Sequence, residues 1–304
     1  MILSPSRPLA PRFSVPWIAA LALSTTACGG LDEDPISCMA TGETKAAVVT
    51  FATFARVIDE ENLRAEGLNL DGVESERGGD TGCAKQDFTA TDGRKGIDNQ
   101  FGMLLPIIEN YVGTENIDAL LSAAIANGQL LLVLAVSGVD DPMNDECVEV
   151  RLGSGAGTPY LDTQGTYEQY QTFGFDSSET PVSHFTTGRI VDGVLEAGPA
   201  PATLPVRILD AAFELKLHNA HLRMEVTHDP VGDGIRLEGY AAGGVDVEQF
   251  REIIKELNIG DDVINTVTPI VGTLADLGPD EEGRCQHVSA ALRLKTTEAF
   301  LLED

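Results

Sequence analysis

AAFELKLHNAHLRMEV, residues 211–226, is the stretch in which apolar and polar side chains alternate most regularly. Apolar residues occupy every second position, and the phase slips by one after Asn219. A period of two is typical of a β-strand with one buried face, and a slip of one residue indicates a bulge. The segment therefore predicts a long, half-buried strand that is bulged or tightly bent at Asn219.

Other strand-like segments lie on both sides of this stretch. Residues 45–58 are apolar and β-branched at first, and we expect a strand or a short helix there, helical toward its end. The Pro- and Ala-rich residues 197–205 predict an exposed connection. The remaining predicted strands fall within residues 130–136, 147–152, 165–175, 184–195, 235–239 and 288–294.

Two pairs of helices are predicted from apolar residues with helical spacing. In the first pair, helices follow Asp98 and Thr114 and stop at Gly113 and Gly128. In the second pair, helices begin near Asp246 and Asp262, the latter kinked at Pro269. Strands without strict β–α–β alternation predict an α+β fold. We expect a mainly antiparallel sheet, either a sandwich or strongly curved, with both helical pairs packed against it.

The N-terminus has the organisation of an export signal. Arg7 and Arg12 are the only charged residues before Cys28, and an apolar run follows at residues 13–23. A run of this length suits a secretory signal and is too short to span a membrane. One interpretation of this signal is an ordinary secretory peptide that is cut near Ala27 and leaves the chain without a lipid.

The sequence TTACGG, residues 25–30, resembles the lipobox of bacterial lipoprotein precursors. The resemblance covers the signal alone, and it implies cleavage before Cys28 and acylation, with palmitate for example, of that residue. It also implies a lipid-anchored protein of the cell envelope, at the outer membrane or cell surface. We therefore expect a signal peptide at residues 1–27, a tether at 28–36 and one β-rich domain at 37–304, which could divide into halves at 37–160 and 161–304.

The chain is strongly acidic, with 48 Asp and Glu against 20 Lys and Arg and a formal net charge of −28. Such a charge repels nucleic acid and anionic lipid head groups, so neither is an expected partner. Membrane attachment must then depend on the acyl chains, and divalent cations are natural counter-ions. A protein or glycan partner is left open.

Five cysteines are present, and Cys28 is assigned to lipid. In an oxidising compartment the remaining four, Cys38, Cys83, Cys147 and Cys285, predict two disulfides, for which three connectivities exist. We expect Cys38–Cys83 and Cys147–Cys285. None of the four lies in a CxxC motif, which argues against structural zinc and thiol redox chemistry.

The segment 69–100 is rich in Gly, Asp and Thr and predicts a long loop. Its carboxylate and amide oxygens are ligands that calcium prefers, although the full pattern of an EF-hand is missing. The alternative is structural: Asp98 would cap the next helix and the Asp-Gly pairs would form turns. The candidate calcium ligands are Asp71, Asp87, Asp92, Asp98 and Asn99.

No catalytic motif stands out. The segment around Ser154 lacks a nucleophile elbow, and there is no phosphate-binding loop, HExxH motif or dinucleotide fingerprint. His218, His221 and His228 form a loose trio that is expected to be solvated on the outward side of strands, with a metal site as the alternative. The lack of a catalytic motif favours a lipid-anchored envelope protein with a binding or structural role, in which calcium could stabilise the acidic loop. The alternatives are an envelope hydrolase without a visible motif, or a carbohydrate-binding adhesin that uses Tyr160, Tyr167 and Tyr170.

Overall fold

A computed structural model describes residues 40–112, 114–163, 165–176, 178, 181–208, 211–229, 232–256 and 260–302. These residues belong to a compact unit that runs from Pro35 to Asp304. The predicted signal, Cys28 and Cys38 lie outside the described residues. Within the described part of the chain, no helix is both long and apolar enough to cross a membrane.

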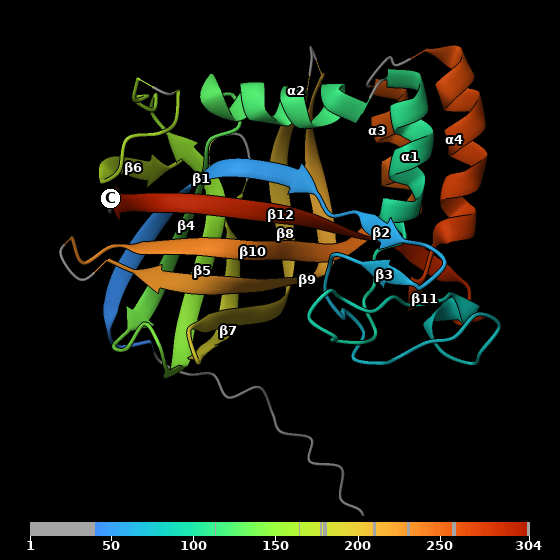
Figure 1. Ribbon diagram of the computed structural model, residues 1–304, viewed down its shortest axis with the longest axis horizontal. Helices are drawn as coiled ribbons and strands as arrows, with labels where there is room; N and C mark the ends of the chain where they lie inside the picture. Colours follow the sequence, from blue (N-terminus) through green and yellow to red (C-terminus); the bar gives the residue numbers. More distant parts are fainter. Residues whose placement is uncertain are drawn as a thin grey trace, which may run out of the picture. The chain divides into compact units, whose positions relative to one another are not determined.

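The order of elements alternates groups of strands with two helical pairs (Figure 1). The helices are α1 (Phe101–Val112), α2 (Thr114–Ala126), α3 (Val247–Glu256) and α4 (Asp261–Leu274), with a short 3-10 turn, η1 (Gly82–Ala84). The strands are β1 (Glu43–Phe54), β2 (Val57–Asp59), β3 (Arg64–Ala65), β4 (Leu132–Val139), β5 (Asp145–Ala156), β6 (Gln171–Phe175), β7 (Ser183–Val191), β8 (Val194–Ile208), β9 (Ala211–His228), β10 (Ile235–Asp246), β11 (Leu277–Pro279) and β12 (Cys285–Leu301).

Eight strands close into an antiparallel barrel in the order β1, β4, β5, β7, β8, β9, β10 and β12. The barrel closes where the first strand pairs with the last, with Val48 opposite Thr297 and Ala52 opposite Leu294. The predicted α+β class and mainly antiparallel strands are confirmed, but the predicted sandwich is wrong. A closed sheet needs no second sheet, because its own inner face buries the apolar side chains.

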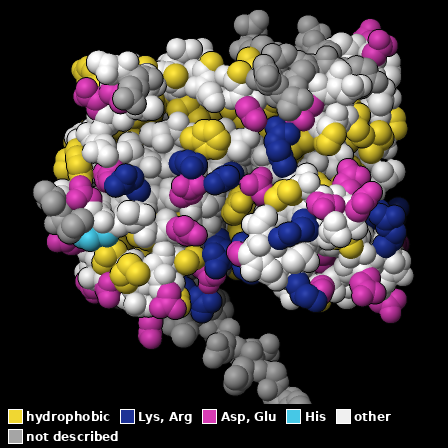
Figure 2. All heavy atoms as spheres, in the orientation of Figure 1, with side chains coloured by type: hydrophobic (Ala, Val, Ile, Leu, Met, Phe, Trp, Pro, Cys, Tyr) yellow, Lys and Arg dark blue, Asp and Glu magenta, His cyan; other side chains and the backbone are white. Residues whose placement is uncertain are grey.

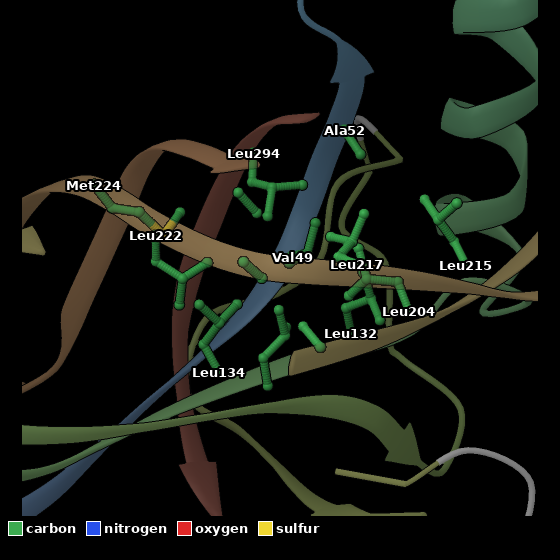
Figure 3. Close-up of a cluster of buried hydrophobic side chains, with 14 of the residues drawn as sticks. Val49, Ala52, Leu132, Leu134, Leu204, Leu215, Leu217, Leu222, Met224 and Leu294 are labelled. Atoms are coloured by element: carbon green, nitrogen blue, oxygen red, sulfur yellow. The ribbon is translucent and has the colours of Figure 1, made fainter. Parts of the chain in front are cut away.

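The interior of the barrel is filled by aliphatic side chains. Figure 3 shows side chains from β1, β4, β8, β9 and β12 pointing toward one another, among them Leu134, Leu222 and Leu294. These three leucines are at most 2% exposed. The apolar phase of the 211–226 stretch supplies Leu215, Leu217, Leu222 and Met224 to this core.

The phase slip at Asn219 is a bulge, as predicted. His218 pairs with Gly244 and His221 with Ala242, so two residues of β9 lie opposite one residue of β10. Asn219 adopts a left-handed conformation with φ of 46°. The extra residue keeps apolar side chains inside on both sides of the bulge.

Helices α1, α3 and α4 stand together at one end of the barrel, and α2 lies along β1 (Figure 1). Phe101 of α1 packs between Phe54 of β1 and Phe250 of α3 in an edge-on and a tilted contact, with ring centroids 5.0 and 5.1 Å apart. The aromatic contacts join both helical pairs to the sheet. Pro269 lies inside α4.

Two local expectations are wrong. The 45–58 segment is not helical toward its end, because β1 continues as a strand to Phe54. The Pro- and Ala-rich segment is part of β8, where Ala202, Leu204 and Val206 are buried. Among the described residues, β7 pairs only with Val194–Ala197 of β8, so the prolines at 199, 201 and 205 lie where one side of the strand has no ladder partner.

Candidate functional site

Residues 57–98, including β2, β3 and η1, form a lobe that packs against the outside of the barrel and that we call the loop lobe. Leu68 and Leu70 of this lobe share a buried cluster with Ala242 of β10 and Ala291 of β12. Small residues on the strands allow this close approach. The predicted long loop is thus an ordered lobe with its own apolar contacts.

A disulfide between Cys83 and Cys285 attaches the loop lobe to the beginning of β12, with the Cα atoms 5.9 Å apart. The predicted pairs Cys38–Cys83 and Cys147–Cys285 are therefore wrong. The loop lobe lies against β12, so Cys83 meets a cysteine that is 202 positions away in sequence. Cys147 is also disulfide-bonded, and Cys38 lies outside the described residues.

Two of the five predicted calcium ligands come together. Asp98 Oδ2 accepts the backbone N–H of Leu70 at 2.6 Å, and Asp87 Oδ2 accepts that of Ser75 at 2.6 Å. The carboxyl groups of Asp87 and Asp98 also hydrogen-bond to each other. Both aspartates are almost fully buried.

A third buried carboxyl group, which the sequence did not single out, belongs to Asp276 between α4 and β11. Its Oδ1 accepts the backbone N–H of Ser289 at 2.8 Å, and its Oδ2 accepts the Ser289 hydroxyl at 2.5 Å. Asp276 interacts electrostatically with Asp87 and Asp98. We call Asp87, Asp98 and Asp276 the acid cluster.

Burial decides the protonation of the acid cluster. Desolvation raises the pKa of Asp98 to about 8, against a smaller lowering by the Leu70 N–H, and Asp276, Asp71 and Asp87 add to the rise. Desolvation raises the pKa of Asp276 to about 7 and also raises the pKa of Asp87. An ionised carboxylate is poorly solvated in such a site, so burial favours a proton on Asp98 and Asp276 near neutral pH.

The other predicted ligands have separate structural roles. Asp71 accepts the N–H of Val73 in an exposed turn, and Asp92 pairs with Arg94 at 2.8 Å. Asn99 caps α1, because its Oδ1 accepts the Gly102 N–H at 3.0 Å. The cap predicted at Asp98 is therefore one residue later. Across the described residues, no three His, Cys, Asp or Glu side chains form a group that could hold a metal ion.

The three histidines of the trio, His218, His221 and His228, make separate contacts. His218 stacks on His287 of β12, with ring centroids 4.2 Å apart, whereas His228 Nδ1 lies 3.2 Å from the carbonyl oxygen of Gly234. His221 is not solvated as expected, because its Nε2 is buried and has no hydrogen-bond partner among the described residues. Burial lowers the pKa of His221.

The three tyrosines that could have bound carbohydrate, Tyr160, Tyr167 and Tyr170, have different surroundings. Tyr160 is 74% exposed, but Tyr167 is buried and donates its hydroxyl to the carbonyl oxygen of Ile125. Tyr170 donates its hydroxyl to Asp229, which raises the Tyr170 pKa to about 12. Tyr167 cannot offer a ring face to a ligand.

A charged groove of about 280 Å³ lies between the loop lobe and the outer face of β9, β10 and β12. Tyr240 of β10 is the register partner of both Arg223 of β9 and Arg293 of β12. Paired residues of antiparallel strands point to the same face, so these three side chains form one row across the sheet. Arg94 approaches from the loop lobe. We call this the arginine groove.

Carboxylates surround the arginine groove. Arg293 lies 2.8 Å from Glu238 and 3.7 Å from Glu66, and the Tyr240 hydroxyl donates to Glu66 at 3.3 Å. Figure 2 shows basic and acidic side chains intermixed over the central strands beside the loop lobe. The groove is lined by three arginines (Arg94, Arg223, Arg293) and four carboxylates (Glu66, Asp92, Glu225, Glu238).

Sequence reasoning missed this groove, although one signal was visible. The alternation of residues 211–226 places Arg223 on the outward face, but nothing in the sequence aligns it with Tyr240 and Arg293. Comparisons with known protein families, with curated proteins and with solved structures find no match to this chain.

Proposed function

We propose that this chain is a lipid-anchored cell-envelope protein with a binding role, and that its ligand is a neutral carbohydrate held in the arginine groove. The observation that carries the proposal is the row Arg223–Tyr240–Arg293 on the outside of the barrel, covered on one side by the loop lobe. An aromatic ring between paired hydrogen-bonding side chains suits a polyhydroxylated ligand.

The charge balance of the groove favours a neutral ligand. Arg223 is bonded to Glu196 at 3.3 Å, and Arg293 to Glu238 at 2.8 Å, so an added anion would compete with existing carboxylates. A neutral hydroxyl can accept from an arginine and donate to a carboxylate without leaving either charge uncompensated. A sugar therefore uses both kinds of group at once.

The protonation of the groove supports binding over glycoside hydrolysis. The Lys295 hydrogen bond lowers the pKa of Glu238, and hydrogen bonds from Arg94 outweigh desolvation to lower the pKa of Asp92. A general acid for glycoside cleavage needs a carboxyl group whose pKa is raised. The pKa values of Glu238 and Asp92 are lowered instead, so neither carboxylate suits the role of general acid.

A glycan array probed with the mature chain carrying Cys28→Ser tests the proposal, followed by calorimetry on the glycans that bind. Arg223→Ala should weaken binding by about tenfold or more, the loss expected for a hydrogen bond to a charged group. Arg189→Ala is the matched control, because Arg189 also pairs with Glu196 but does not line the groove.

Two results contradict the carbohydrate proposal. One is an array on which no glycan binds in a saturable manner. The other is an equal loss of affinity in Arg223→Ala and Arg189→Ala, which would mean that the effect depends on Glu196 and not on the groove.

The lipid anchor is a separate part of the proposal and rests on the lipobox-like sequence at Cys28. Export in a bacterium fed labelled palmitate should label the chain and place it in the membrane fraction. Cys28→Ser should remove the label and release the protein. Labelling that survives this substitution would contradict acylation at Cys28.

Calcium is a second candidate ligand, at Asp87 and Asp98; because no third acidic side chain completes a metal-binding group in the described residues, backbone carbonyl or water oxygens would have to complete its coordination shell. Its support is that Asp87 and Asp98 are buried in contact, with Asp276 and Asp71 within electrostatic reach. Thermal unfolding with calcium and with chelator tests it. A saturable rise in melting temperature that Asp98→Asn abolishes would support calcium, whereas an unchanged melting temperature would leave protons as the neutralising species.

A further inference from the structure

A second pocket, of about 340 Å³, lies between the loop lobe and helices α1 and α4, and it is distinct from the arginine groove. The lobe contributes Leu63, Arg77 and Lys85, α1 contributes Met103, and α4 contributes Leu274. We call it the helix-side pocket. No residue of the acid cluster or of the arginine groove lines it.

The floor of the helix-side pocket is apolar. Leu63 and Met103 pack on the edge of the buried cluster that contains Phe88, and Leu274 packs on the barrel core. Leu63, Met103 and Leu274 are only partly buried, so their side chains meet solvent in the pocket. Apolar surface of this kind gains free energy when an apolar ligand covers it.

Leu63 keeps its apolar side chain at a conformational cost. Its φ is 52°, in the left-handed region that glycine and asparagine prefer. The Leu63 carbonyl oxygen accepts the N–H of Thr89 at 2.7 Å, which fixes the backbone there. A strained position occupied by leucine is consistent with a use for the side chain in the pocket.

Two cations lie at the same pocket. Among the residues that the structure describes, neither Arg77 nor Lys85 forms an ion pair, although acidic residues outnumber basic ones by 48 to 20 in the chain. Their lack of an ion pair contrasts with the arginine groove, where Arg94, Arg223 and Arg293 are paired. Glu60 is the one carboxylate in the lining of the helix-side pocket.

We propose that the helix-side pocket binds a single-chain amphiphile with an anionic carboxylate head, a free fatty acid. The alkyl chain lies on Leu63, Met103 and Leu274, and the carboxylate pairs with Arg77 and Lys85. The apolar floor favours the alkyl chain, and the two cations favour the carboxylate. Glu60 opposes the head group and limits affinity.

Calorimetry with sodium dodecanoate below its micelle concentration tests this site, using the mature chain with Cys28→Ser so that no attached acyl chain competes. The wild-type pocket should bind dodecanoate saturably and bind dodecanol about tenfold more weakly, a difference of about 1.4 kcal/mol. The double variant Arg77→Gln/Lys85→Gln should bind dodecanoate about tenfold more weakly than the wild type does, and it should no longer prefer dodecanoate to dodecanol. Glu60→Gln should tighten dodecanoate binding.

Lys95→Gln is the matched control, because it removes one positive charge from the same lobe at a residue that pairs with Glu74 and does not line the pocket. Leu63→Gly tests whether ligand affinity can fall without a loss of folding stability. It relieves the left-handed backbone and should leave the melting temperature unchanged or higher, yet it should weaken dodecanoate binding.

Three outcomes overturn the proposal. They are equal affinity for dodecanoate in the wild type and the Arg77→Gln/Lys85→Gln variant, an equal loss in Lys95→Gln, or no saturable binding of dodecanoate. Vesicles containing phosphatidylglycerol distinguish a lipid surface from a free fatty acid. Binding to vesicles without binding to dodecanoate is a case of the third outcome.

Discussion

The hydroxyl of Ser289 donates to Asp276 Oδ2 at 2.5 Å, and both residues are buried. The same hydroxyl oxygen accepts the backbone N–H of Gln100 at 2.8 Å. One serine on β12 thereby joins the segment after α4 to the residue that precedes α1. The acid cluster is built on this connection between the barrel and its two helical pairs.

Folding stability should fall as the pH rises from about 6 to about 8. The pKa of Asp98 is about 8 in the folded chain and 3.8 is its ordinary value, so between those values the folded carboxyl holds a proton that the unfolded one has lost. Each pH unit in that window then costs about 1.4 kcal/mol of stability per fully buried carboxyl. Asp276, with a pKa of about 7, adds to the effect at the lower end.

Denaturant unfolding in chelator at both pH values measures this slope. Asp98→Asn keeps an oxygen for the Leu70 N–H and removes the titration, so it should flatten the dependence. A slope that is unchanged in this variant would locate the titration elsewhere.

Removing the Cys83–Cys285 bond should lower stability by about 3–5 kcal/mol, because it closes a very long loop and restricts the unfolded chain. The double variant Cys83→Ser/Cys285→Ser, compared with wild type in guanidinium, measures the loss without reducing the disulfide at Cys147. Peptide mapping under non-reducing conditions should recover Cys83 joined to Cys285. A peptide that joins Cys147 to Cys285 would disprove this connectivity.

Arg56 after β1 neutralises a buried carboxylate in α1. Its Nη2 lies 2.6 Å from Glu109 Oε1 and 3.2 Å from Asp118 of α2, and Glu109 is 8% exposed. Arg56→Met should cost about 3 kcal/mol, because Glu109 would be left buried without a partner. Thermal unfolding checks the loss, and adding Glu109→Gln should restore part of it. An unaltered melting temperature in Arg56→Met would show that the pair is dispensable.

Leu222→Ala should destabilise the barrel by about 2–5 kcal/mol, because it opens a cavity among the inward side chains. Leu302→Ala, at a leucine that is 61% exposed, is the control and should change stability little. Urea unfolding compares the two. Equal losses would contradict the assignment of Leu222 to the closed core.

Local patterns predicted several elements correctly. The helical spacing of residues 101–112 is helix α1, which ends at Val112, and the alternation of residues 211–226 with its slip at Asn219 is a bulged strand. These features depend on backbone periodicity and on neighbouring residues, which a sequence displays directly. The Pro- and Ala-rich part of β8 was misjudged because its composition resembles a connection, while its burial depends on the strands beside it.

The sequence by itself determined the α+β class, the helical pairs and the outward position of Arg223. The tertiary structure alone decided the closure of β1 onto β12, the Cys83–Cys285 bond, the meeting of Asp98 with Asp276 and the row of Arg223, Tyr240 and Arg293. The physical reason is the sequence distance over which each feature is determined. Periodicity is set within a few residues, whereas strand register and closure align side chains that lie far apart in the chain, through pairings that no local pattern encodes.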